Sequence, residues 1–184
     1  MTSSRGLGDV YKRQGGNFVS ASPDSTRTSK AIGNLSMGVH VSTKLNRSHL
    51  IQTEENLILP CLGRTELDKQ DSGNQFVTVE NSMGVVHMSR GTLKPASPSL
   101  RSEPWIIAEL AATTLVNSTI DYQLLAKNYD GIRDLIGKCV AGFEDYNVRV
   151  RMENGFFLPN PPKDIQQFET EDGLAHFSIN DLPD

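Results

Sequence analysis

The chain of 184 residues is slightly polar, with 37% hydrophobic residues, 22% charged residues and a formal net charge of −4. Its basic residues form no stripe that could neutralise nucleic-acid phosphates, so we expect no nucleic-acid partner. The longest apolar stretch, 105–116, is shorter than the roughly 20 residues that span a bilayer, so we expect no membrane span. Cys61 and Cys139 match no disulfide or metal-binding spacing, which predicts a cytoplasmic, reducing location.

The first fourteen residues, MTSSRGLGDVYKRQ, show neither a helical nor a strand period. We interpret residues 1–14 as a non-native linker scar, or else as a disordered leader, and leave them out of the fold prediction. The Gly-Gly-Asn turn at 15–17 then begins without a strand before it. This pattern favours a chain that was cut just before Gly15.

The next segment alternates between strand and helix patterns. A serine, a proline and an aspartate announce the first helix, and Thr43 is the expected cap of the second. A continuous apolar run at 56–60 is typical of a strand buried on both faces. The expected elements are a helix over 23–35, a strand over 37–42, a short helix over 44–50 and a strand over 56–60. Their alternation predicts an α/β fold with a partial Rossmann-like parallel sheet and flanking helices.

The rest of the chain predicts a hairpin followed by helices. A polar loop over 61–73 leads into strands that alternate in polarity, and Ser102 is placed to cap the first long helix. The expected elements are strands over 75–80 and 85–89, helices over 103–116, 121–126, 130–140 and 143–151, a proline-rich connector over 157–163 and a strand over 175–179.

Catalytic and metal-binding patterns are weak. The four histidines are scattered, and we expect structural roles for them: His40, His49, His87 and His176. Glu66, Asp68 and Asp71 could act as acid and base, but an acidic surface loop explains them equally well. Cys61 follows a predicted buried strand and could face a ligand, although such a cysteine is more often an inert small hydrophobe.

A family resemblance rests on segments that occur in a fixed order. They are GGNFVSASPD at 15–24, VSTKLNRSHL at 41–50, LILPCLGRTELDKQDSGNQFVTVENSMGVVHMSRG at 58–91, LRSEPWIIAELA at 100–111, GFEDYNVRVR at 142–151 and FFLPNPPKD at 156–164. With these segments the chain resembles the formate-dehydrogenase-like alpha subunits of the molybdopterin oxidoreductases. The resemblance covers essentially residues 15–184 and is least distinctive over 113–140.

The resemblance implies an internal piece of a larger enzyme. The parent would oxidise formate or a similar small substrate by two-electron transfer to molybdenum, and this piece alone would be inactive. The implied cofactors are a bis-molybdopterin guanine dinucleotide with molybdenum, which this piece helps to bind, and an iron–sulfur cluster outside it. No catalytic residue and no metal ligand is expected here. The implied domains are the leader at 1–14, a partial Rossmann-like dinucleotide-binding domain at 15–116, a helical extension and connector at 117–164, and the first strand of a C-terminal barrel domain at 165–184.

Two polar turns are expected to contact the dinucleotide, because ligands of open α/β sheets bind beyond the carboxyl ends of the strands. Glycines let the backbone approach a pyrophosphate or ribose, and an asparagine amide both donates and accepts. Free N–H groups and a lysine at a helix start suit a phosphate. The candidates are Gly15, Gly16 and Asn17 in the first turn, and Ser42, Thr43, Lys44, Asn46 and Arg47 in the second.

Glu80 and Asn81 form a third candidate position. A carboxylate can accept from both the ring N–H and the exocyclic amine of guanine, so Glu80 is the expected base-recognising residue. A cap, a turn or a surface charge would explain each candidate equally. The alternative function is a free-standing, non-catalytic α/β module that binds a nucleotide or a partner.

Overall fold

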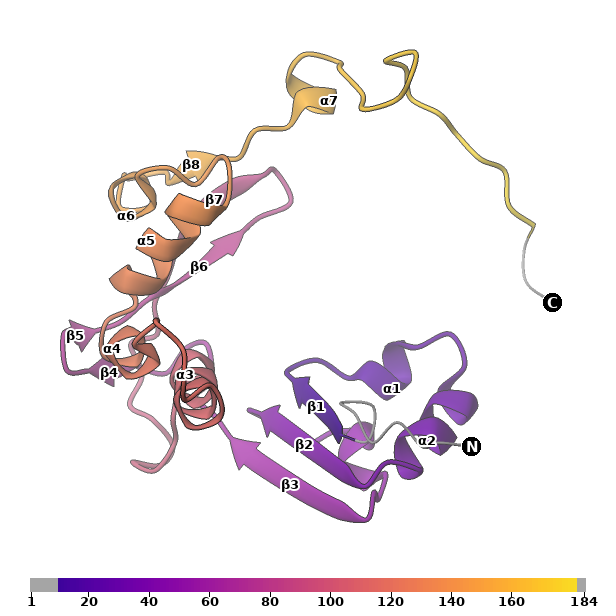
Figure 1. The fold of residues 1–184 in the computed structure, drawn as a ribbon, viewed down its shortest axis with the longest axis vertical. Helices are drawn as coiled ribbons and strands as arrows, with labels where there is room; N and C mark the ends of the chain where they lie inside the picture. The colour runs from indigo at the N-terminus through magenta and orange to yellow at the C-terminus, as the bar shows by residue number, and fades with distance from the viewer. Residues whose placement is uncertain (1–9, 182–184) are drawn as a thin grey trace. The chain divides into compact units, whose positions relative to one another are not determined.

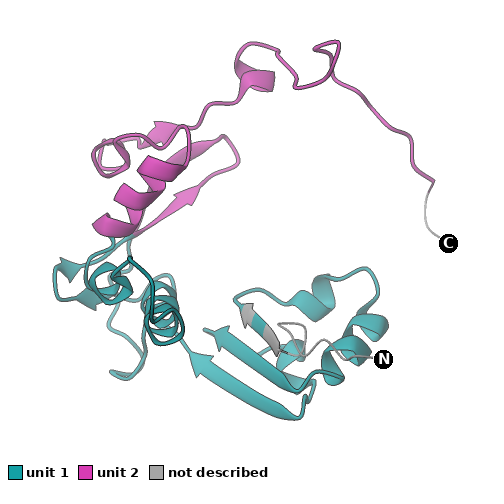
Figure 2. Cartoon of the chain, in the orientation of Figure 1, with its two compact units in different colours: residues 1–76, 90–129 teal, residues 77–89, 130–184 magenta. Residues whose placement is uncertain are grey.

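The computed structural model describes residues 10–181 and divides the chain into two compact units (Figure 2). The first unit comprises the chain up to residue 76 together with residues 90–129, and the second comprises residues 77–89 and the chain from 130 onward. Strands and helices alternate in the first unit, which confirms the predicted α/β fold class.

A three-stranded parallel sheet organises the start of the first unit (Figure 1). Its order is β1 (Val10–Gln14), β2 (Met37–Ser42) and β3 (Glu55–Pro60), with β2 in the middle. β1 corrects the expectation that the leader carries no structure and that no strand precedes Gly15. Residues 1–9, the rest of that leader, lie outside the described residues. Because all three strands run in parallel, their carboxyl ends meet at one edge of the sheet.

The prediction that the 56–60 strand is buried on both faces is wrong. Leu57 and Ile58 remain 44% and 43% exposed. β3 is an outer strand of its sheet, and the described residues do not cover it on both faces. The apolar run therefore predicted the strand correctly, whereas burial depends on neighbours that a local pattern does not specify.

Short helices flank this sheet: α1 (Phe18–Ala21), α2 (Ser25–Gly33) and the 3₁₀ helix η2 (Arg47–Leu50). The Asp24 side chain caps α2 by accepting from Arg27 N at 2.8 Å, so α2 starts two residues later than predicted. The expected cap Thr43 does not start η2. Asn46 does so, because its side chain accepts from Ser48 N at 3.0 Å.

The first unit also contains a small hairpin, β4 (Lys69–Gln70) with β5 (Gly73–Asn74), and the helices α3 (Glu103–Thr114) and α4 (Tyr122–Lys127). Ser102 caps α3 as predicted. Buried Tyr129 connects these parts, because its hydroxyl donates to Asp68 Oδ2 at 2.6 Å and also hydrogen-bonds Ser102 Oγ. Its backbone N–H donates to Gln75 Oε1 at 3.0 Å. This polar network fixes the loop after β3 to the start of α3.

The second unit combines an antiparallel sheet with short helices: β6 (Val77–Glu80), β7 (Val85–Ser89), β8 (Phe156–Phe157), α5 (Asp130–Cys139), α6 (Tyr146–Arg149) and α7 (Pro161–Asp164). The rings of Phe143 and Phe156 pack on Tyr146 within 6 Å centroid separation, at 4.8 and 5.6 Å. The predicted strand over 175–179 is absent, and Phe177 is 94% exposed. An isolated extended segment lacks the partner strand that would stabilise it.

Tyr129 should give the chain an alkaline limit of stability. Burial and the hydrogen bond to Asp68 raise the pKa of Tyr129 above the ordinary value of about 10. The folded chain therefore favours the protonated phenol, and this contribution is complete below about pH 10 and lost as the pH rises above it. We expect the urea midpoint of the wild type to fall in that range, and Tyr129→Phe to show a shallower fall. Tyr122→Phe is the control, and identical pH profiles for wild type and Tyr129→Phe would contradict this role.

Gly155 should tolerate no side chain. A β carbon there would lie 2.0 Å from Val86 O, and its φ of +65° already disfavours other residues. Gly173 has a similar φ of +70° but nothing within 4 Å of its β carbon. We expect Gly155→Ala to lower the free energy of unfolding by roughly 3 kcal/mol or more, and Gly173→Ala by about 1 kcal/mol. Urea unfolding measures both, and equal losses would show that the β7 contact is unimportant.

Candidate functional site

The site lies at the carboxyl edge of the parallel sheet, which we define as residues 15–17, 42–48 and 61. Gly15 and Gly16 follow β1 with φ values of +63° and +64°. This left-handed conformation suits glycine, because it has no β carbon. Gly15 N donates to Val41 O at 3.0 Å, so the turn stays attached to β2 after β1 has ended.

Side chains connect the two turns of the carboxyl edge. Asn46 Nδ2 donates to Gly16 O at 3.0 Å. Ser48 is fully buried, and its hydroxyl donates to Asn17 Oδ1 at 3.1 Å while it accepts from Val19 N at 3.4 Å. The turn after β1 is therefore held in place by the turn after β2, and the predicted residues Asn17 and Asn46 carry that connection.

His49 extends the same network. The Asn46 backbone N–H donates to His49 Nδ1 at 3.0 Å. His49 Nε2 also forms a hydrogen bond with Ser42 Oγ at 3.0 Å. The His49 ring lies against His40 with 4.7 Å between centroids. His49 thus has the structural role expected for the histidines, because its contacts stabilise the turn after β2.

The outward side of the carboxyl edge carries exposed donors. Thr43, Lys44 and Arg47 are exposed, and neither cation forms an ion pair with a described residue. Arg47 and Lys30 also border a hollow of about 490 Å³ that hydroxyl groups line: Ser20, Ser25, Thr26 and Ser29. Arg47 and Lys30 beside these hydroxyl donors can hold an anion such as a diphosphate.

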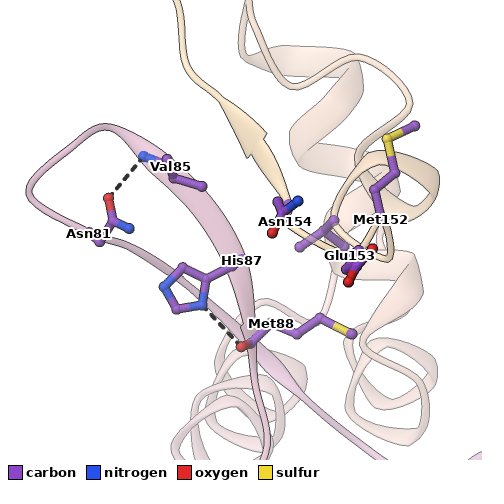
Figure 3. A pocket seen from close by; sticks show the side chains of 9 residues that line it. Asn81, Val85, His87, Met88, Met152, Glu153 and Asn154 are labelled. Atoms are coloured by element: carbon purple, nitrogen blue, oxygen red, sulfur yellow. Dashed lines mark hydrogen bonds between the residues drawn. The ribbon is translucent and has the colours of Figure 1, made fainter.

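Glu80 and Asn81 lie in the second unit. Glu80 ends β6 and is exposed. Asn81 Oδ1 accepts from Met83 N at 2.9 Å and from Val85 N at 3.2 Å, so it stabilises the β6–β7 turn. Asn81 also borders a hollow of about 300 Å³, whose other lining side chains include His87, Met88 and Glu153 (Figure 3).

The acidic loop that carries Glu66, Asp68 and Asp71 has a structural role, because its carboxylates bind neighbouring segments. Both oxygens of Glu66 are engaged, accepting from Gly63 N and from Ala96 N at 2.6 Å each, and these bonds hold the pKa of Glu66 below its ordinary value. Asp68 accepts from Tyr129, and Asp71 pairs with Lys127 at 3.6 Å on the surface. These contacts favour the structural interpretation of the loop over acid–base catalysis.

Two further residues lie at or beside the carboxyl edge. Cys61 follows β3 and is buried, and its N–H donates to Ser42 O at 3.1 Å. Burial, followed by the charges of Glu103 and Glu66, raises the pKa of the Cys61 thiol to about 11. Glu103 begins α3, and a β carbon on Gly15 would lie 3.9 Å from Glu103 Oε1. Sequence reasoning treated Glu103 only as a residue of a predicted helix, because its approach to Gly15 is a long-range contact.

Residues 10–181 contain neither a metal-binding cluster nor a helix that could span a membrane. No group of three or more His, Cys, Asp or Glu residues is arranged to hold a metal ion there. The helices in this range are also too short or too polar to cross a membrane.

Comparison with known proteins gives relatives but no family model, and no solved structure matches the chain. An uncharacterized oxidoreductase of Mycobacterium tuberculosis (strain H37Rv) is 46% identical over 174 residues, which cover 94% of this chain and 22% of that protein. Protein YdeP of Escherichia coli (strain K12) is 44% identical over 163 residues, which cover 89% of this chain and 21% of YdeP.

The chain thus spans about a fifth of the length of the curated relatives it matches. It is related in sequence to proteins that carry the name oxidoreductase. The name YdeP states no activity, and neither name specifies a cofactor or a substrate.

The two thiols should differ sharply in reactivity. Cys139 is exposed, whereas Cys61 is buried with its pKa raised to about 11. At pH 8 we expect iodoacetamide to label Cys61 on the order of 100-fold more slowly than Cys139, because the thiolate is the reacting form. Mass spectrometry of the native chain, with Cys139→Ser as the matched variant, measures this. Similar rates for both thiols would mean that Cys61 is open to a ligand.

Proposed function

We propose that the chain is part of a molybdopterin-dependent oxidoreductase of the formate-dehydrogenase-like type, and that its carboxyl edge binds a molybdopterin guanine dinucleotide. The observation that carries the proposal is the left-handed Gly15–Gly16 turn, fixed by Asn46, next to exposed Lys44 and Arg47. A dinucleotide carries a diphosphate, and this donor set is complementary to one. The oxidoreductase names of the mycobacterial relatives support the reaction class.

Several residues of the carboxyl edge suit such a ligand. Glycine lets a phosphate approach the backbone closely, and the hydrogen bonds of Asn17, Ser48 and Asn46 hold the turns before the ligand arrives. A preformed loop loses little conformational freedom on binding. Lys44 and Arg47 then supply charge, and Thr43 supplies a hydroxyl donor.

The cofactor, when bound, would supply the two-electron redox chemistry at molybdenum, and the protein supplies position and electrostatics. Formate or a similar small molecule is the proposed substrate of the full-length protein. An iron–sulfur cluster would belong to a part of that protein outside this chain. We assign no catalytic role to the described residues, and their proposed task is to hold the nucleotide end in place.

A cytoplasmic location completes the proposal. Both cysteines are free, Cys61 in the interior and Cys139 on the surface, and free thiols persist in a reducing compartment. Because the mycobacterial and enterobacterial relatives are several times longer, we do not adopt the free-standing binding module.

Loss of the donors at the carboxyl edge should lower cofactor content. In the full-length protein, Thr43→Ala with Lys44→Ala removes a hydroxyl and a cation from the proposed diphosphate site. Each charge-assisted hydrogen bond contributes about 1.5–3 kcal/mol, so we expect affinity to fall by roughly 10- to 100-fold. Molybdenum by mass spectrometry and guanine nucleotide released by acid, each per mole of purified protein, measure the effect.

Lys94→Ala is the matched control, because Lys94 is an exposed cation elsewhere in the first unit. It should leave molybdenum and nucleotide content unchanged. Full cofactor occupancy in the double variant would remove the carboxyl edge from the proposed site.

A further inference from the structure

We propose that Glu103 recognises the base at this site: its carboxylate accepts two hydrogen bonds from a 2-amino-4-oxopyrimidine ring, the ring shared by guanine and pterin. This inference rests on the proposed function. It concerns Glu103 because this residue belongs to the same compact unit as the carboxyl edge.

The position of Glu103 is fixed by its neighbours. Ser102 is buried, caps α3 by accepting from Trp105 N, and hydrogen-bonds the hydroxyl of buried Tyr129. Glu103 is the next residue, so the start of α3 places its carboxylate. Gly15 lies opposite, and the space where its β carbon would stand is 3.9 Å from Glu103 Oε1. Because glycine has no side chain, Gly15 leaves the space between the Glu103 carboxylate and the glycine turn open.

The carboxylate is available to a ligand. Glu103 is partly exposed, and its side chain forms no hydrogen bond or ion pair with any residue in the 10–181 range. Glu66, by contrast, has both oxygens occupied by backbone N–H groups. The two acids lie close enough to the Cys61 thiol to affect it, so they occupy the same region, but only Glu103 has free acceptors.

The donor pattern of the ligand follows from the chemistry of a carboxylate. An ionised carboxylate only accepts hydrogen bonds, and its two oxygens match two parallel N–H donors. Guanine and pterin offer a ring N–H beside an exocyclic amine. Hypoxanthine offers the ring N–H alone, and adenine presents an unprotonated ring nitrogen that a carboxylate repels. Glu103 therefore predicts a preference in the order guanine, hypoxanthine, adenine.

A purely structural role predicts something different. An acid in the first turn of a helix interacts favourably with the helix dipole, so replacing it can lower stability. Such a role would not distinguish one base from another. Base preference, rather than stability or cofactor content, is therefore the decisive measurement.

The test is calorimetric titration of the full-length protein, prepared without its cofactor, with GDP, IDP and ADP. For the wild type we expect GDP to bind about tenfold more tightly than IDP, and IDP more tightly than ADP. Glu103→Gln should weaken GDP binding by about tenfold or more and should not weaken ADP binding, because it removes the charge that repels the unprotonated ring nitrogen of adenine. Neopterin, which has the same ring without a phosphate, serves as a fourth probe. Tighter binding of GDP assigns the ring to guanine, and tighter binding of neopterin assigns it to pterin.

Matched variants separate this inference from the proposed function. Lys44→Ala with Arg47→Ala should weaken GDP, IDP and ADP alike, because it removes phosphate contacts only. Glu109→Gln, further along α3, should change none of the affinities. If Glu103→Gln keeps the wild-type preference for GDP over ADP, Glu103 does not recognise the base. The phosphate site would still stand in that case, provided that the Lys44 and Arg47 variant weakens all nucleotides.

Discussion

The candidate site depends on one buried hydroxyl group. Ser48 is completely buried, donates to Asn17 Oδ1 and accepts from Val19 N, and so joins η2 to the turn and helix that follow β1. A hydroxyl has one donor and two acceptor positions, and this arrangement uses one of each kind. Together with the contact from Asn46 to Gly16, it connects two loops that follow different strands.

Inward hydrogen bonds and outward charges are divided between different residues. Asn17, Asn46 and His49 form the internal network, whereas Lys44 and Arg47 point their charges at solvent. A residue that already has its hydrogen bonds satisfied contributes to a ligand site by fixing geometry. An exposed cation that forms no ion pair with a described residue attracts an anionic ligand. The proposed diphosphate site needs both kinds, and the parallel order of the strands brings them to one edge.

Residues adjacent in sequence predicted the helices and strands better than they predicted burial and long-range contacts. The bounds of β2 and the Ser102 cap of α3 were predicted correctly, because each depends on residues that are adjacent in sequence. β1 was missed because its sequence, VYKRQ, is polar and irregular, and only pairing with β2 makes it a strand. The competition between Thr43 and Asn46 as caps was decided by His49, which completes the capping box of Asn46.

The same reasoning explains why sequence analysis named Glu80, and not Glu103, as a candidate for base recognition. Each is an acid next to a turn or a helix start, and no local pattern distinguishes them. What distinguishes them is the long-range approach of α3 to Gly15, which the buried contact between Ser102 and Tyr129 helps to fix. A site at a sheet edge draws its backbone donors from consecutive strand ends, so sequence order predicts them. The proposed acceptor, Glu103, lies 88 residues beyond Gly15 (103 − 15), and only the folded chain brings it near that turn.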